Sequence, residues 1–340
     1  AASDVYKRQV LGCGRIGAMH AANIHGHDSA ELAAVFDVHA PSAEAAGAKF
    51  GCRVASSVDD VLANGAIDAV LIATTTDTHA DLIEAAVKAG KAVLCEKPID
   101  LSLERVNRCA EAIAAFNVPI QIGFNRRFDP GHRAARQALL AGEIGDLPQV
   151  IITSRDPGMP PRSYIESAGG LLRDMTIHDF DLARYMLNDE PVEVYAVADA
   201  LIDPQLGKDL DDVDTAMIIM RTADGKMCHI NNSRTATYGY DQRIELLGRD
   251  GMLISDNRKP HEMRRYTAKS TEISEPYLHF FIERYEQSFN AEISAFVDAV
   301  KSGKPTEVSF EDGRRALMLA EAAYLSRKSG RAVKVEEVGG

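Results

Sequence analysis

A glycine-rich turn near the start of the chain constrains the fold more than any other segment. Residues 12–17 read Gly-Cys-Gly-Arg-Ile-Gly, the G-x-G-x-x-G spacing, and follow the apolar residues Val10 and Leu11. Asp37 lies 20 residues after the last glycine, at the end of an apolar run. A strand, a tight turn, a helix and an acidic residue at this distance predict a βαβ unit that binds a dinucleotide. The alternative is a structural turn with a capping aspartate.

Each residue of the turn has an expected role in dinucleotide binding. Gly12 permits the tight turn, Gly14 lets the backbone approach the pyrophosphate, and Gly17 allows a helix to pack closely on a strand. Arg15 and Ile16 open that helix, whose N-terminus would face the phosphates.

The residue at position 37 also selects the cofactor. The carboxylate of Asp37 accepts hydrogen bonds from both hydroxyls of the adenosine ribose and repels a 2′-phosphate. Val38 and His39 supply no arginine beside it. We therefore expect NAD rather than NADP.

The hydrophobic pattern predicts two domains. Alternating strands and helices up to residue 123 are typical of a parallel sheet, and after that point runs with a period of two predict a mostly antiparallel sheet. We expect a Rossmann domain over 1–123 and an α+β domain with an open sheet over 124–340. The expected strands are 32–37, 67–73, 92–96, 120–123, 150–154, 192–198, 215–221, 226–233, 242–248 and 251–255, and the expected helices include 42–50, 78–89, 102–116, 133–141, 171–187, 288–301 and 311–328.

The first nine residues do not fit this pattern. A buried parallel strand is normally a near-continuous apolar run, but Lys7, Arg8 and Gln9 precede Val10. We expect residues 1–9 to be a non-native start that weakens the beginning of the first strand.

Composition excludes several classes of protein. The net charge of −12 disfavours nucleic acid as a partner, since it repels a polyphosphate. The five cysteines contain no C-x-x-C pair and are odd in number, which disfavours a disulfide framework or a zinc site and suits a reducing compartment. No apolar run approaches the roughly 18 residues of a membrane span, and no signal peptide is evident. We expect a cytoplasmic protein that binds no metal and no membrane.

Lys97 is the first candidate catalytic residue. It follows the strand expected over 92–96, in the run Cys95-Glu96-Lys97-Pro98. Ligands of open α/β sheets bind beyond the carboxyl ends of the strands, so Lys97 would point into the crevice beside the nicotinamide. The alternative is a solvated surface lysine.

Asp174 and His178 form the second candidate element. They are four residues apart on an expected helix and would share one face. A neutral imidazole that takes a hydroxyl proton, oriented by a carboxylate, is what a metal-free alcohol dehydrogenase needs. The alternatives are an ion pair on the helix surface, or a capping aspartate with a histidine at the edge of the core. Zinc is disfavoured because no third ligand is spaced nearby.

These motifs together resemble one known family. The fingerprint, the run 73–79, Glu96-Lys97-Pro98 and the Gly-Gly-x-x-x-Asp-x-x-x-His run over 169–178 are similar to the glucose–fructose oxidoreductase/inositol dehydrogenase/MocA family. The resemblance spans about residues 10–335. Within the family, the runs 126–129, 154–157 and 238–243 resemble the members that oxidise inositol.

The resemblance implies site residues and an assembly. It places Thr74, His79 and Glu96 along the dinucleotide and makes Lys97, Asp174 and His178 catalytic. It also implies that Arg127, Asp156 and Tyr238 face a small neutral polyol held between the domains, a homotetramer formed through the open sheet, and a cis peptide before Pro98. The alternatives are an ion pair between Arg127 and Asp129, and a packing role in the sheet for Tyr238.

The expected reaction is NAD-dependent oxidation of one hydroxyl to a ketone, with myo-inositol as the leading substrate and inositol catabolism as the setting. Two rivals remain: a dehydrogenase for another inositol isomer or a sugar, and a catalytically silent protein that senses NAD. The presence of both Lys97 and His178 argues against the silent protein.

Overall fold

The computed structural model describes residues 6–339, which form two compact units. The first unit runs to Asn125 and also contains Phe289–Leu317, and the second contains Arg126–Ser288 and the chain from Met318 onward. The chain first passes from one unit to the other after Asn125, close to the boundary expected at residue 123. The return of Phe289–Leu317 to the first unit is a feature that a single boundary does not describe.

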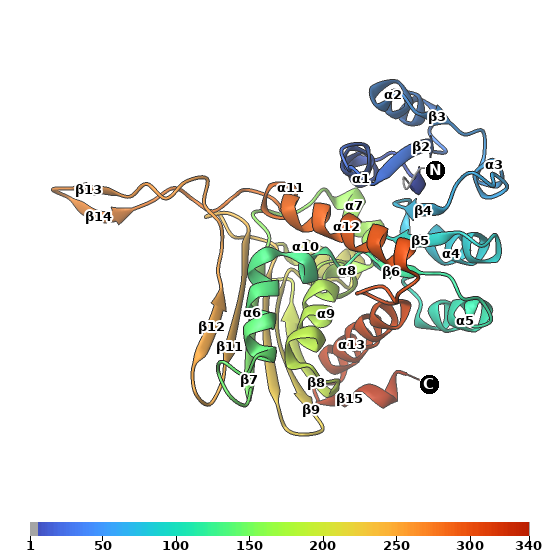
Figure 1. The fold of residues 1–340 in the computed structure, drawn as a ribbon. Helices are drawn as coiled ribbons and strands as arrows, with labels where there is room; N and C mark the ends of the chain where they lie inside the picture. The colour runs from blue at the N-terminus through green and yellow to red at the C-terminus, as the bar shows by residue number, and fades with distance from the viewer. Residues whose placement is uncertain (1–5, 340) are drawn as a thin grey trace. The chain divides into compact units, whose positions relative to one another are not determined.

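The first unit contains a six-stranded parallel sheet in the order β3-β2-β1-β4-β5-β6 (Figure 1). This strand order has its reversal point between β1 and β4, and its parallel sheet confirms the predicted Rossmann class. Its elements are β1 (Tyr6–Leu11), α1 (Arg15–His25), β2 (Ala30–Phe36), α2 (Ala40–Phe50), β3 (Arg53–Val54), α3 (Val58–Leu62), β4 (Ala69–Ile72), η1 (Thr76–Thr78), α4 (His79–Lys88), β5 (Ala92–Cys95), α5 (Leu103–Ile113) and β6 (Ile120–Ile122).

The first strand is longer than the sequence pattern indicates. β1 begins at Tyr6 and pairs with β2 and β4, although its register against β2 shifts between Arg8 and Gln9. The expectation that residues 1–9 do not fit a strand is therefore wrong for residues 6–9, because backbone pairing extends β1 through polar residues. Residues 1–5, part of the expected non-native start, lie outside the described residues.

The second unit contains a seven-stranded sheet in the order β12-β11-β7-β10-β9-β8-β15. Only the pair β7 and β10 is parallel, so the predicted mostly antiparallel sheet is confirmed. Helices α6 and α9 lie along one face of it (Figure 1). The strands are β7 (Gln149–Arg155), β8 (Pro191–Asp199), β9 (Thr215–Thr222), β10 (Met227–Ser233), β11 (Asp241–Leu247), β12 (Met252–Ser255) and β15 (Val333–Lys334).

The remaining elements of the second unit include some that were not expected from the sequence. A separate hairpin of β13 (Arg265–Thr267) and β14 (Ser270–Ile273) extends away from β11 and β12 (Figure 1). The helices are η2 (Asn125–Phe128), α6 (Pro130–Leu140), α7 (Arg162–Ala168), α8 (Gly170–Asp174), α9 (Thr176–Leu187), α10 (Pro204–Leu210), α11 (Phe281–Arg284) and η3 (Val335–Glu337). Short helices such as α7 and α10 carry little periodic signal, which explains why pattern reading misses them.

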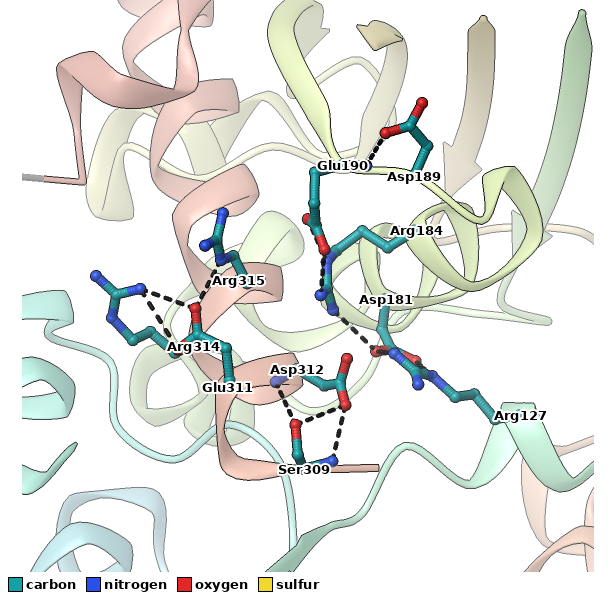
Figure 2. A network of polar contacts seen from close by, with 10 residues as sticks. All are labelled: Arg127, Asp181, Arg184, Asp189, Glu190, Ser309, Glu311, Asp312, Arg314 and Arg315. Carbon is teal, nitrogen blue, oxygen red and sulfur yellow. Dashed lines mark hydrogen bonds and ion pairs between the residues drawn. The ribbon is translucent and has the colours of Figure 1, made fainter. Parts of the chain in front are cut away.

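Two longer helices, α12 (Glu286–Ser302) and α13 (Phe310–Ser329), each contribute residues to both units. Figure 2 shows the start of α13, where the Ser309 N–H and hydroxyl both donate to Asp312 at 2.8 Å and Arg315 donates to Glu311 at 2.6 Å. Such capping satisfies N–H groups that the first turn of a helix leaves unpaired. Within residues 6–339, no helix is both long and apolar enough to cross a membrane.

The polar start of β1 leads to a prediction about stability. Arg8 and Gln9 are 1% and 0% exposed, and their side-chain nitrogen and oxygen atoms have no hydrogen-bond partner among the described residues. Burial lowers the pKa of Arg8 to about 10. An unsatisfied buried polar group costs roughly 1–3 kcal/mol. We expect Arg8→Met and Gln9→Val each to raise the melting temperature in calorimetry.

Lys7→Met is the matched control, because the neighbouring Lys7 side chain is 42% exposed on the same strand. This change should shift the melting temperature little. A lower melting temperature for both Arg8→Met and Gln9→Val would contradict this prediction. It would show that the two polar side chains make interactions that stabilise the fold.

Candidate functional site

The glycine turn of the first unit leaves no room for side chains at two of its positions. Gly12 has a φ of +90°, and a Cβ there would lie 2.4 Å from the Ala73 carbonyl oxygen. A Cβ on Gly17 would lie 1.8 Å from the carbonyl oxygen of Gly12. Both distances are far below a van der Waals contact, so the turn after β1 requires glycine at both positions.

Gly14 differs from the other two glycines because the space around it is open. A Cβ on Gly14 would meet nothing within 4 Å, and the residue caps the N-terminus of α1. Arg15 is exposed and Ile16 half-buried in the first turn of that helix. A helix N-terminus beside open space suits an anionic group such as a pyrophosphate. The turn therefore fits the dinucleotide that its sequence predicts.

Asp37 lies next to this turn, directly after β2. Its carboxyl oxygens accept hydrogen bonds from the Cys13 N–H at 2.6 Å and the His39 N–H at 2.7 Å. These two bonds hold the carboxyl group in place and leave further acceptor capacity, since a carboxylate offers about four lone-pair sites. Burial, followed by the charge of Asp37, raises the pKa of the Cys13 thiol to about 11, so this cysteine stays protonated.

His79 connects the segments that follow β4 and β5. Its Nδ1 lies 2.8 Å from the Pro98 carbonyl oxygen and its Nε2 lies 3.2 Å from that of Thr74. The Thr74 hydroxyl lies 2.7 Å from the hydroxyl of Thr78. Burial lowers the pKa of His79, while the contacts with the two carbonyl oxygens oppose this shift. His79 thus fixes the loops at the expected cofactor edge, and its predicted contact with the dinucleotide stays a prediction.

Lys97 follows β5 and is half-buried, and the peptide between Lys97 and Pro98 is cis, as predicted. The preceding Glu96 has its carboxyl group 2.7 Å from Nε2 of the buried His20. Glu292 is also fully buried, and burial together with the charge of Glu96 raises its pKa well above the usual value.

In the second unit, Asp174 belongs to a cluster of polar side chains. It accepts a hydrogen bond from the Tyr164 hydroxyl at 2.8 Å and lies 3.4 Å from the guanidinium of Arg234. The same guanidinium lies 3.8 Å from the carboxyl group of Asp156. Burial raises the pKa of Asp156 to about 6, against the opposing charge of Arg234. Because 19% of the Asp156 side chain remains exposed, solvent moderates the energetic effect.

The structure corrects the expectation of one helix over 171–187. Asp174 ends α8, Met175 interrupts the helix, and His178 lies in the first turn of α9. The buried hydroxyl of Thr176 donates to Asn232 on β10 at 2.7 Å, which ties the start of α9 to the sheet. Met175 itself keeps right-handed helical backbone angles, and its N–H donates to the Leu171 carbonyl oxygen at 2.9 Å. Asp174 and His178 therefore lie on two helices that one helical residue joins.

Arg127 and Tyr238 each have a well-defined partner in the second unit. Arg127 donates two hydrogen bonds to Asp181, at 2.8 and 2.5 Å, and Asp181 lies 3.8 Å from Arg184 (Figure 2). Arg127 therefore pairs with Asp181. Tyr238 donates to Asp241 at 2.7 Å and accepts from Arg155 at 2.9 Å. The proposed contacts of Arg127, Asp156 and Tyr238 with a polyol stay predictions.

Sequence reasoning missed Tyr164 and Arg234, which touch Asp174, and the buried pair of His20 and Glu292 near Glu96. These residues lie between 10 and 196 positions from their partners in the chain, and they belong to no recognised motif. Only the burial of such polar side chains identifies them, and burial at this distance requires the fold.

The parallel sheet with its glycine turn, and a second unit that carries a polar cluster, define a dinucleotide-dependent oxidoreductase. A family model described as the NAD-binding Rossmann fold of an oxidoreductase family matches residues 7–124, and its C-terminal alpha/beta domain matches 136–335. The chain therefore belongs to the glucose–fructose oxidoreductase/inositol dehydrogenase/MocA family of oxidoreductases, as the motifs predicted. NAD is the cofactor of its first unit.

Similar proteins cover nearly the whole chain. The inositol 2-dehydrogenase of Rhizobium meliloti (strain 1021) is 46% identical over 96% of this chain and 98% of its own length. The myo-inositol 2-dehydrogenase of Thermotoga maritima is 42% identical over 97% and 99%. The crystal structure of scyllo-inositol dehydrogenase from Lactobacillus casei with NAD(H) and scyllo-inositol has a TM-score of 0.90 at 31% identity, covering 98% and 99% of the two chains.

The position of Asp37 leads to a prediction about the choice of cofactor. We expect NAD to bind at least tenfold more tightly than NADP, because a 2′-phosphate would meet the carboxyl group that the Cys13 and His39 N–H groups hold in place. Tenfold corresponds to about 1.4 kcal/mol, which one repulsive contact supplies. Isothermal titration of both cofactors measures the ratio.

Asp37→Ser should narrow this ratio, while Asp28→Ser, at an exposed aspartate of the same unit, should leave it unchanged. Equal affinities of the wild-type protein for the two cofactors would refute the assignment.

Proposed function

We propose that this enzyme oxidises one hydroxyl of a cyclic polyol with NAD, most simply the 2-hydroxyl of myo-inositol to 2-keto-inositol. The observation that carries the proposal is the cluster of Asp156, Tyr164, Asp174 and Arg234 on the segments around His178. Hydroxyl groups of a neutral polyol need both acceptors and donors, and this cluster offers both.

The names of the relatives support the same substrate class. They act on myo-inositol and on scyllo-inositol, so another inositol isomer is the nearest alternative, and a sugar is the next. A catalytically silent NAD sensor is disfavoured because Lys97, Asp174 and His178 are all present.

The proposed chemistry divides between proton and hydride transfer. NAD, when bound, accepts the hydride from the carbon that carries the hydroxyl. His178 takes the hydroxyl proton in its neutral form, and Asp174 orients the imidazole. The charge of Lys97 stabilises the alkoxide that develops as the proton leaves. Tyr164 and Arg234 hold the Asp174 carboxyl group, at 2.8 and 3.4 Å.

The expected catalytic test is NAD reduction with a panel of myo-inositol, scyllo-inositol and glucose. His178→Ala should lower kcat by about 10²–10⁴-fold, the range of a positioned acid–base group. Lys97→Ala should also lower kcat. The wild-type rate should fall as the pH is lowered, because a protonated imidazole cannot accept the proton.

The control is His261→Ala, at an exposed histidine near the hairpin, which should keep the wild-type rate. NAD affinity should survive His178→Ala, since the cofactor belongs to the first unit. Near-normal kcat of His178→Ala would exclude this residue as the base, and an inactive wild-type protein across the panel would exclude the proposed function.

We also propose that the enzyme is a homotetramer formed through the seven-stranded sheet. The burial of β9 alternates, so Ile218 and Met220 are buried while Met217 and Ile219 are 56% and 52% exposed. Val197 on β8 and Ile254 on β12 are exposed as well. An apolar sheet face of this extent is typical of a surface that another subunit covers. The five free cysteines suit a reducing compartment such as the cytoplasm. We propose inositol catabolism as the setting of the enzyme, from its proposed substrate.

Light scattering should report four copies for the wild-type protein at micromolar concentration. Placing charges in the apolar face with the double change Met217→Glu and Ile219→Lys should reduce the assembly to smaller species. Phe116→Glu, at an exposed apolar residue of the first unit, is the control and should leave the mass unchanged. A monomeric wild-type protein would contradict the proposal.

A further inference from the structure

Two consecutive glycines precede the helix that ends at Asp174. Gly169 and Gly170 both have a φ of +82°, a conformation that side chains rarely tolerate. Gly169 ends α7, and Gly170 begins the five-residue helix α8. The helical backbone continues from α8 through Met175 into α9, so contacts at these glycines act on the segment that leads to Asp174 and α9.

Two side chains from distant segments meet at these glycines. Leu171 N–H donates to Oδ1 of Asp212 at 2.8 Å, and the Tyr324 hydroxyl donates to the Gly169 carbonyl oxygen at 3.0 Å. A Cβ on Gly170 would lie 2.4 Å from that hydroxyl and 2.6 Å from Oδ1 of Asp212. Glycine at position 170 is thus required by these two neighbouring side chains as well as by its backbone angles.

An ion pair adds a third contact on the same short helix. Arg173 makes two hydrogen bonds to Glu321 on α13, at 2.5 and 2.9 Å, and its guanidinium stacks over the Tyr324 ring at 4.5 Å. All of these contacts lie within the second unit. They connect α13 and the segment after α10 to the backbone that leads directly into Asp174.

We propose that Asp212 and Tyr324 are positioning residues for the reaction, and that they act through the Gly169–Gly170 turn on the placement of Asp174 and the first turn of α9. The inference rests on the proposed function, in which Asp174 orients His178. A displacement of about 1 Å in a catalytic group can cost about 10²-fold in rate. Loosening the turn therefore lowers kcat more than it changes the binding of NAD.

The surroundings of Asp212 allow a precise conservative variant. Asp212 is 3% exposed, and its Oδ2 has no hydrogen-bond partner among the described residues. Asp212, Gly169, Gly170 and Tyr324 also line a cavity of about 520 Å³. Asp212→Asn keeps the Oδ1 acceptor for the Leu171 N–H. Its amide nitrogen would replace Oδ2, which accepts no hydrogen bond in the described part of the chain, so no hydrogen bond within the protein is lost. Asp212→Ala removes the acceptor.

The first experiment compares kcat, KM and NAD affinity of these variants with the polyol that the wild-type protein oxidises. We expect Asp212→Ala to lower kcat by about 10–100-fold, with NAD affinity by titration near that of the wild-type protein. Asp212→Asn should recover most of the rate. A normal kcat for Asp212→Ala, or an equal loss in Asp212→Asn, would overturn the proposal.

A double-mutant cycle tests the close contact between Tyr324 and Gly170. Gly170→Ala places a methyl group against the Tyr324 hydroxyl, so its effect on kcat should be smaller in a Tyr324→Phe background, where that hydroxyl is absent. Additive effects of the two changes would show that Tyr324 does not act through Gly170.

Hydrogen–deuterium exchange separates failure of this proposal from failure of the proposed function. Asp212→Ala should speed exchange of the amides at 171–178, and Asp212→Asn should not, whether or not a polyol is oxidised. Unchanged exchange at 171–178 in Asp212→Ala would overturn the proposal that Asp212 positions this segment. A wild-type protein that oxidises no polyol would overturn only the function.

Discussion

The close approach of backbone at the glycine turn is the constraint on which the first unit depends. Cβ atoms at Gly12 and Gly17 would lie only 2.4 and 1.8 Å from carbonyl oxygens, so the ends of β1 and β4 can meet the start of α1 only without side chains. Because β1 and β4 flank the point where the strand order reverses, this contact also places the dinucleotide site. The proposed roles of Asp37 and Lys97 follow from it, since Asp37 comes directly after β2 and Lys97 lies two residues beyond β5 in the same sheet.

A buried ionic network has the corresponding role in the second unit. Arg126 donates to Asp179 at 2.5 Å, and Asn232 donates to the same carboxyl group at 2.8 Å and accepts from Thr176. Burial raises the pKa of Asp179, while Arg126 and the hydrogen bonds oppose this shift. Because desolvation offsets much of the attraction in such a pair, its main consequence is geometric. It holds the first turn of α9, which carries His178, against β10.

Much of the fold was predictable from sequence, because strands and long helices each have a characteristic spacing of apolar residues. The fingerprint, Lys97 at the end of β5 and the second sheet were all found in this way. The contacts of Asp212 and Tyr324 at the start of α8 were not, because these two residues lie about 40 and 150 positions further along the chain. The start of β1 was not predicted either, because the polar residues Arg8 and Gln9 argue against a buried strand. In the structure they are buried and pair with strands on both sides. Arg234 and Tyr164 carry no local pattern, and only the fold brings them to Asp174.

The charges around Asp174 also bear on the class of substrate. One guanidinium, that of Arg234, lies within 3.8 Å of two carboxyl groups, those of Asp156 and Asp174. Burial raises the pKa of Asp156 to about 6, and the charge of Asp174 adds to this rise while Arg234 and Arg126 oppose it. A phosphorylated or carboxylated sugar would bring negative charge beside these two carboxyl groups, whereas a neutral polyol would donate its hydroxyls to the carboxyl oxygens. The electrostatics of these side chains therefore favour an uncharged polyol over a sugar acid or a sugar phosphate.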